Sequence, residues 1–193
     1  NLTSRSGRHV IKHRLTELGY KTEDYDLEAV YDAFLKLADK KGQVYDYDLE
    51  ALLFFDKQKH DQAHFQLLYL QANSGREIIP SATVKMKVGT EEITQSSIGN
   101  GPVDAAYKAI MSILGHEDLE VVDFKLDSKG EGADALAQVS VIATYKGRRF
   151  HGIGLATDIV EAGVKALIFV LNNTYLADQI DQQKNQQINQ KKL

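Results

Sequence analysis

The chain has 193 residues, of which 43% are hydrophobic and 26% are charged, an ordinary balance for a globular protein. Its net charge of -4 and its scattered basic side chains give no electrostatic reason to expect nucleic acid as a partner. The absence of cysteine excludes disulfides and thiolate metal sites. No apolar run approaches the ~20 residues needed to span a bilayer. The lack of cysteine is compatible with a cytoplasmic protein, and we expect no nucleic-acid or membrane partner.

Residues 1–57 are predicted to form a small all-helical subdomain. The spacing of apolar residues favours one helix before Gly19, a second between Asp26 and Gly42, and a short third helix from Asp46. Three short helices bury too little apolar surface to be stable alone, so we expect this subdomain to pack on another domain or chain.

Two polar segments are predicted to lie outside any core. Residues 58–64 are poor in apolar side chains and form the predicted linker. The last segment, residues 178–193, is rich in Gln and Asn and cannot bury a core. We predict a frayed helix or, more simply, disorder there.

Residues 65–177 contain the same order of elements twice. Each half has three strand-like stretches with apolar residues at every second position, then a glycine corner, then an amphipathic helix. The corners are Gly99-Asn100-Gly101 and Gly152-Ile153-Gly154. The pattern predicts an internal duplication of a strand-strand-strand-helix unit about 55 residues long. We expect an α+β architecture in which the strands of both units lie side by side under two helices.

The first glycine corner is the strongest candidate for a binding site. Glycine lets a backbone approach a ligand closely, and Pro102 suits the first position of a helix, whose free N–H groups attract a carboxylate or phosphate. A tight turn without a ligand is the alternative. The matching second corner suggests that two helix starts frame one pocket, either within the chain or across a dimer interface.

No constellation of catalytic residues is evident. His9 and His13 lie four residues apart on one helix face, but no third metal ligand accompanies them, and a solvated face is the simpler interpretation. His151 faces either solvent or a pocket. Asp104 and Asp158 stand near helix starts, where a carboxylate favours the positive end of the helix dipole. We predict no catalytic residue, no metal and no cofactor in this chain, which reads as a binding module.

Three stretches of the sequence resemble the α-isopropylmalate synthase family, and the likeness runs from the first residue to about Asn173. One lies in the helical subdomain, and one lies at each glycine corner. They are Ser4-Arg5-Ser6-Gly7-Arg8-His9 with Leu15-x-x-Leu18-Gly19-Tyr20, Gly99-Asn100-Gly101-Pro102-Val103-Asp104-Ala105, and Tyr145-x-Gly147-x-x-Phe150-x-Gly152-x-Gly154-x-Ala156-x-Asp158-Ile159.

The resemblance implies a regulatory fragment of an enzyme. Members of the family condense acetyl-CoA with 2-oxoisovalerate, the first committed step of leucine synthesis, in a (β/α)8 barrel that needs a divalent metal. Such a barrel needs ~200 or more residues and would precede this chain. The chain would then hold the helical linker and a regulatory domain that binds L-leucine, forms a homodimer and contacts the barrel. Linker side chains of the family reach the partner's active site. The candidates here are His9, His13, Tyr20, Tyr25 and Tyr31, and no catalytic assignment follows.

The resemblance also implies a set of leucine-binding positions. Phe124 stands where some members carry Tyr, which removes a hydroxyl from the pocket, and the small Ala135 and Ala137 leave room for an isobutyl group. An apolar pocket with loop amides and carbonyls suits an amino-acid zwitterion. The full set is Asn100, Gly101, Pro102, Val103, Val121, Phe124, Ala135, Ala137, Leu155 and Thr157.

Two alternatives remain open at this point. The related citramalate synthases have a regulatory domain of similar plan that responds to isoleucine. A dimerisation module without a ligand would also explain the fold and the lack of catalytic residues.

Overall fold

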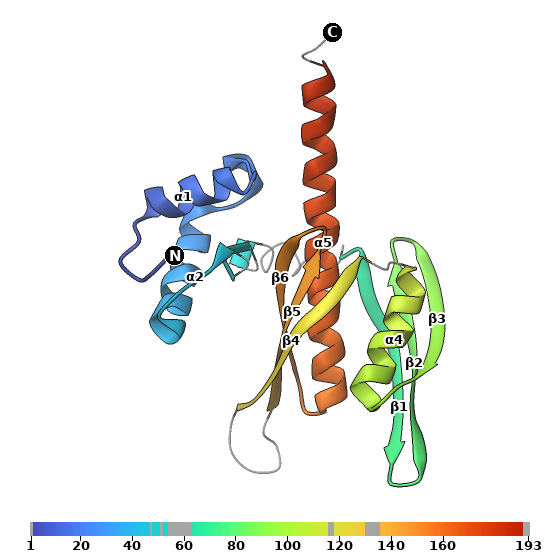
Figure 1. Ribbon diagram of the computed structural model, residues 1–193. Coiled ribbons are helices and arrows are strands. Elements are labelled where there is room, and N and C mark those ends of the chain that lie inside the picture. Colours follow the sequence, from blue (N-terminus) through green and yellow to red (C-terminus); the bar gives the residue numbers. More distant parts are fainter. Residues whose placement is uncertain are drawn as a thin grey trace. The chain divides into compact units, whose positions relative to one another are not determined.

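The computed structural model describes residues 2–190 except 47, 51, 54–62, 116–117 and 130–135. The chain divides into two compact units, Asn1–Asp61 with Tyr175–Leu193 and Gln62–Thr174. The elements, coloured along the chain in Figure 1, are α1 (Arg8–Glu17), a short 3-10 helix (Thr22–Asp24), α2 (Leu27–Lys41), β1 (Phe65–Gly75), β2 (Ile78–Val88), β3 (Glu91–Ile98), α4 (Pro102–Leu114), β4 (Leu119–Lys129), β5 (Leu136–Tyr145), β6 (Arg148–Ala156) and α5 (Ile159–Gln190).

The first unit is helical, as predicted. The Asp26 side chain accepts hydrogen bonds from the first backbone N–H groups of α2, and Gly42 ends that helix with a φ of 76°. Helical residues recur from 46 to 53 among those that the structure describes. The core of this unit consists of fully buried side chains from all three stretches: Ile11, Leu15, Phe34, Val44 and Leu49.

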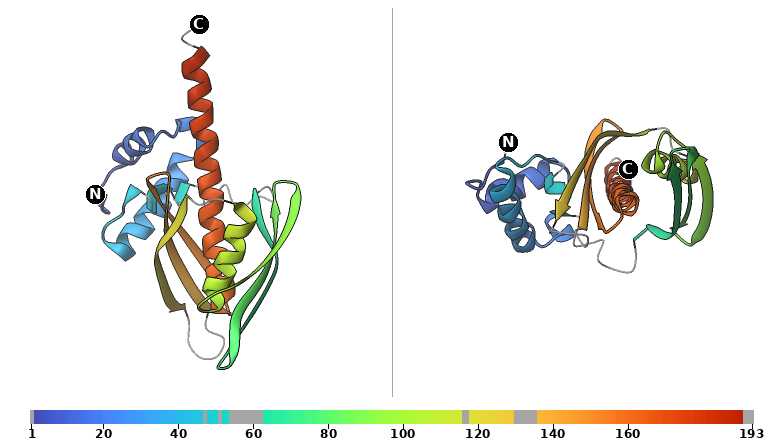
Figure 2. Two further views of the ribbon diagram at one scale, coloured as in Figure 1. Left: turned by 45° about the vertical axis from the view of Figure 1, so that its right-hand side comes forward. Right: turned by 90° about the horizontal axis from the view of Figure 1, so that it is seen from below.

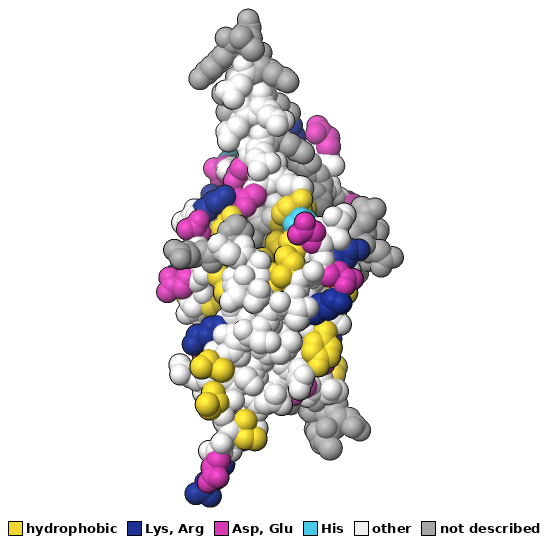
Figure 3. Space-filling model, turned by 90° about the vertical axis from the view of Figure 1, so that its right-hand side faces the viewer, with side chains coloured by type: hydrophobic (Ala, Val, Ile, Leu, Met, Phe, Trp, Pro, Cys, Tyr) yellow, Lys and Arg dark blue, Asp and Glu magenta, His cyan; other side chains and the backbone are white. Residues whose placement is uncertain are grey.

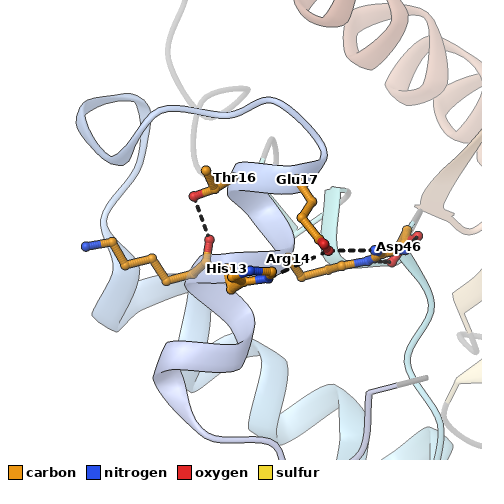
Figure 4. Close-up of polar contacts among 6 residues, drawn as sticks. His13, Arg14, Thr16, Glu17 and Asp46 are labelled. Atoms are coloured by element: carbon orange, nitrogen blue, oxygen red, sulfur yellow. Dashed lines mark hydrogen bonds and ion pairs between the residues drawn. The ribbon is translucent and has the colours of Figure 1, made fainter.

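One ion-pair cluster joins α1 to the segment that follows α2. Arg14 Nε donates to Asp46 Oδ1 at 2.8 Å, and its Nη2 donates to Asp46 Oδ2 at 2.5 Å (Figure 4). The remaining Nη1 donates to Glu17 Oε2 at 2.8 Å. These hydrogen bonds raise the pKa of Arg14 and lower the pKa of Glu17. Because both partners of the bidentate pair are 40% exposed, the pair fixes orientation more than it adds stability.

The second unit confirms the duplication, with one difference in how its strands pair. Its described strands form two separate antiparallel sheets, ordered β1-β2-β3 and β4-β5-β6, where we expected all strands side by side. Helices α4 and α5 lie between the two sheets (Figure 2). Each half buries its apolar strand face under its own helix, and the two helices then meet. The sheets therefore do not need to pair with each other.

The register shows how closely the two halves correspond. A β-bulge interrupts the pairing of β1 between Leu67 and Tyr69, and another interrupts β4 between Val121 and Asp123. The bulges fall at the same place in each half, so Leu67 is the counterpart of Val121. Bulges bend a strand and redirect its side chains. The duplication therefore extends to local irregularities of the backbone.

The second glycine corner lies within a strand and not in a loop. We expected Gly152 and Gly154 to turn the chain, but both belong to β6 and face α5. A Cβ on Gly152 would lie 2.2 Å from the carbonyl oxygen of Ala166, and one on Gly154 would lie 2.0 Å from that of Ala162. The alternate glycines thus remove the side chains that would hold the helix away from the strand.

Helix α5 departs from two expectations. Over Ile159–Gln179 it is long and apolar enough to span a membrane, a length that we did not expect in any segment. However, 61% of this window is buried, as in a helix that belongs to a protein core. At residues 178–193, where we predicted a frayed helix or disorder, the helix continues to Gln190. Gln and Lys are good helix formers even where they bury little surface.

We predict that Gly154→Ala destabilises the second unit by roughly 2 kcal/mol or more, because the new methyl group would overlap the carbonyl of Ala162. Chemical denaturation followed by circular dichroism measures the loss. The control is Gly101→Ala, whose Cβ would meet no atom within 4 Å. It should cost only about 0.5 kcal/mol. Equal losses for both variants would contradict the close approach of β6 to α5.

Candidate functional site

The loop that leads into α4 is held by its own hydrogen bonds. Gly101 is the N-cap of α4, and its φ of -162° is extended backbone that any residue can adopt. The backbone N–H of Asn100 donates to Asp104 Oδ2 at 2.8 Å, and Lys108 Nζ lies 2.9 Å from the same oxygen. Both interactions lower the pKa of Asp104. The carboxylate therefore stays ionised and caps the loop.

Of the two glycines in this loop, Gly99 is the one that packing requires. A Cβ on Gly99 would lie 2.5 Å from the backbone nitrogen of Ala105, whereas one on Gly101 would lie in open space. The open space beside Gly101 and Pro102 is where the predicted ligand would approach.

Three of the predicted leucine-binding residues share the helix-facing side of the second sheet. Val121 pairs with Ala143, Phe124 pairs with Val141, and Ala137 pairs with Ala156. Residues paired across antiparallel strands project to the same face. This face of the sheet is the one covered by α5.

Three other predicted residues do not join this group. Leu155 pairs with Gln138 and projects to the opposite face, where it is 47% exposed. Thr157 is also exposed. Ala135 lies outside the described residues. The structure thus brings together part of the predicted set, and the set stays a prediction.

The two halves of the unit meet at Tyr107, a residue that the sequence analysis did not single out. Its hydroxyl donates to the carbonyl oxygen of Gly163 in α5 at 2.7 Å, and its ring stands edge-on to Phe124 with 6.5 Å between centroids. A Cβ on Gly163 would be 3.5 Å from Phe124 and 3.6 Å from Val103. Three elements therefore meet around one small residue: α4, β4 and α5. A tyrosine on an otherwise apolar helix face is the signal that would have indicated this contact, since a buried hydroxyl needs an acceptor.

A second hydrogen-bonded contact joins α5 to β1 in the same unit. The Asn172 side chain accepts from the backbone N–H of Phe65 at 2.9 Å and donates to the Phe65 carbonyl at 3.0 Å. Asn172 is buried, and this pairing satisfies both of its polar groups. Helix α5 is therefore bonded to the first strand of the other half.

The arrangement offers binding surfaces and no reaction machinery among the described residues. No three side chains of His, Cys, Asp or Glu gather as a metal site within them. His151 lies on the face of the second sheet away from α5, where its Nε2 is 2.5 Å from Ser140 Oγ. The region around Tyr107 and Gly163 can supply apolar side chains together with the backbone groups at the start of α4.

A cavity of about 700 Å³ also lies in the second unit, between β1 and the start of α5. Of the ten predicted leucine-binding residues, it includes Pro102 alone.

The two duplicated halves thus form one domain whose helices meet between two sheets. The sequence matches the family described as the LeuA allosteric (dimerisation) domain over residues 43–175, and the chain belongs to this family.

Similar proteins carry the name 2-isopropylmalate synthase. One from Pseudoalteromonas atlantica is 80% identical over 187 residues, which is 97% of this chain and 36% of that protein. One from Tolumonas auensis is 57% identical, and one from Serratia proteamaculans is 54% identical, each covering 95% of this chain and 35% of the relative. The chain thus spans about a third of the length of these relatives.

We predict that Tyr107 makes the second unit less stable in alkali. Burial raises its pKa above the usual 10.0. Below pH 10.0 both the folded and the unfolded states hold the phenolic proton. Above it only the unfolded state releases the proton, so the free energy of unfolding falls by up to about 1.4 kcal/mol per pH unit. Tyr107→Phe should remove this slope and cost about 1 kcal/mol at neutral pH through the lost hydrogen bond.

Denaturant unfolding at a series of pH values measures both effects. Tyr45→Phe, at a position that is 40% exposed, serves as the control and should leave the alkaline slope in place. An unchanged slope in Tyr107→Phe would contradict the buried hydrogen bond.

Proposed function

We propose that this chain is the leucine-responsive regulatory part of a 2-isopropylmalate synthase. The family match to an allosteric (dimerisation) domain and the name of the relative at 80% identity support this proposal. The whole protein would condense acetyl-CoA with 2-oxoisovalerate in the cytoplasm. A barrel with a divalent metal, outside this chain, would perform the reaction, and the chain alone would be inactive.

The proposal assigns a role to each region. Residues 65–177 form the domain that binds L-leucine and pairs with a second copy, residues 1–57 form the helical linker to the barrel, and residues 58–64 connect the two. Leucine binding would change the packing of the regulatory domain, and the linker would pass that change to the barrel. A coupling free energy of about 1–3 kcal/mol is typical of such regulation.

The observation that carries the proposal is the junction around Gly163. Val103 at the start of α4 and Phe124 on β4 both lie within 3.6 Å of the position that a Cβ on this residue would take, and they belong to different halves of the duplication. A ligand with a small apolar side chain placed beside them would contact both halves at once and would bias their relative position. The backbone N–H of Asn100 is already bonded to Asp104, so the backbone groups at Gly101, at the start of α4, would hold its charged ends.

The remaining predicted residues extend the same site. Val121 and Ala137 provide apolar surface on the sheet face that Phe124 shares. Leu155 faces away from this junction and Thr157 is exposed, so we propose that they reach a leucine across the interface of a homodimer.

Calorimetric titration with amino acids tests the function. We expect saturable binding of L-leucine, with L-isoleucine and L-valine at least about tenfold weaker, a difference of 1.4 kcal/mol. Preference for isoleucine would favour a citramalate synthase. No response to any of the three, from a chain shown to be folded and dimeric, would leave a dimerisation module without a ligand.

We predict that Gly101→Asp abolishes leucine binding and leaves the fold intact. The added carboxylate would repel the carboxylate of the ligand at the start of α4. The fold should tolerate it because the backbone at Gly101 is extended, its Cβ position is empty, and Asp is a favoured N-cap residue. Calorimetry gives the affinity, and thermal unfolding checks stability.

The matched control is Gly7→Asp, which places the same residue at the N-cap of α1, also in open space. It should bind leucine like the unmodified chain. Unchanged affinity in Gly101→Asp would rule out the assignment of the leucine site to this loop.

A further inference from the structure

The cavity of about 700 Å³ has two chemically distinct walls. One wall is β1, the edge strand of the first sheet, which contributes Leu67, Leu70 and Ala72. The other is the first two turns of α5, which contribute charged side chains, and Pro102 closes one end. The volume lies within the range of ~300–1,000 Å³ typical of small-molecule sites.

The duplication relates this cavity to the proposed leucine site. That site combines the start of α4 with β4 of the other half, and the cavity combines the start of α5 with β1 of the other half. In the register of the two sheets, Leu67 corresponds to Val121 and Leu70 corresponds to Phe124, because each pair stands at the same distance from its bulge. In the helices, the ion pair of Lys165 with Glu161 matches the ion pair of Lys108 with Asp104.

The residues that correspond to Tyr107 and Phe124 near the cavity have smaller side chains. On the α4 side, Tyr107 bridges to Gly163 and packs its ring against Phe124. On the α5 side, the counterpart of Tyr107 is Val164, and the counterpart of Phe124 is Leu70. Neither can form the corresponding bridge. Of these two residues only Leu70 lines the cavity, so the smaller side chain on β1 contributes to the open space where the other half has an aromatic ring.

The charges around the cavity have both signs. Lys165 Nζ lies 3.1 Å from Glu161 Oε1, and Asp158 Oδ1 accepts a hydrogen bond from the backbone N–H of Glu161 at 2.9 Å. Lys165 and Glu161 are 46% and 43% exposed, so a ligand can reach them. An ammonium group would bind the carboxylates and a carboxylate would bind the lysine, while the leucines of β1 would cover an apolar side chain. This combination matches an amino-acid zwitterion.

We propose that this cavity is a second ligand site of the domain, and that it takes an apolar α-amino acid. The site uses the same class of ligand as the proposed function and shares Pro102 with the leucine site, but its other residues are different, so the two sites can be tested separately. A domain with two sites related by its internal duplication would bind the same metabolite at both sites, or two metabolites of one class.

Methyl-labelled nuclear magnetic resonance of the chain can separate the two sites. The probes are L-leucine, L-isoleucine, L-valine and L-methionine, each titrated to about 10 mM, which detects dissociation constants into the millimolar range. We expect saturable shifts of the methyl groups of Leu67, Leu70 and Ala72 with at least one probe. Shifts of Val103 and Val121 report on the leucine site instead.

Variants of the two walls complete the test. Leu70→Trp should fill the cavity and weaken its response at least about tenfold, and Lys165→Gln, at an exposed position, should weaken it about fivefold without burying new groups. Asn73→Trp is the control, because Asn73 is exposed on the outer face of the same strand. Figure 3 shows that much of this side of the molecule is neither charged nor hydrophobic, and the variant should respond like the unmodified chain.

The outcomes are distinguishable. Gly101→Asp should leave the shifts of the β1 methyl groups within about twofold while it removes those of Val103 and Val121. Absence of any shift at β1 with all four probes would overturn the second site and leave the leucine proposal untouched. A β1 response that survives in both Leu70→Trp and Lys165→Gln would also overturn the second site. Shifts at β1 alone would support the second site and overturn the leucine assignment.

Discussion

The close approach of α5 to β6 is the constraint on which the rest of the second unit depends. Gly152 and Gly154 present bare backbone to the carbonyl groups of the helix, where any side chain would overlap them. The helix therefore lies against its sheet at a depth that brings the backbone of Gly163 within reach of the other half. Tyr107 can bond to that backbone only at this depth. A local lack of side chains thus determines how two halves of a domain meet.

The sequence predicted the elements well and their mutual placement less well. Period-two alternation and the repeated order of elements were enough to predict two strand-strand-strand-helix units, because such patterns depend on neighbours along the chain. The number of sheets depends on which surfaces are already covered, which no local pattern records. The same limit explains Gly152 and Gly154, since a glycine that turns a chain and a glycine that admits a helix look alike in sequence.

The candidate site was likewise predicted only in part from the sequence. Resemblance to a family located the α4 loop and the residues of β4 and β5, and the structure places Val121, Phe124 and Ala137 on one face. It did not indicate Tyr107 and Gly163, whose importance lies in a hydrogen bond between segments far apart in the chain. Nor could it indicate a cavity, because an empty volume arises from side chains that are smaller than their counterparts.

Helix α5 is common to both units, and this has a consequence for synthesis of the chain. Its first half belongs to the second unit, and from Tyr175 onward it belongs to the helical unit, where Leu176 packs against the core. The helical unit is therefore encoded in two pieces, with a whole folded unit between them. During synthesis, residues 2–53 leave the ribosome before the residues from Tyr175 onward that belong to the same unit. The helical unit can complete its core only after the second unit has been made, so the end of the chain sets when the beginning becomes stable.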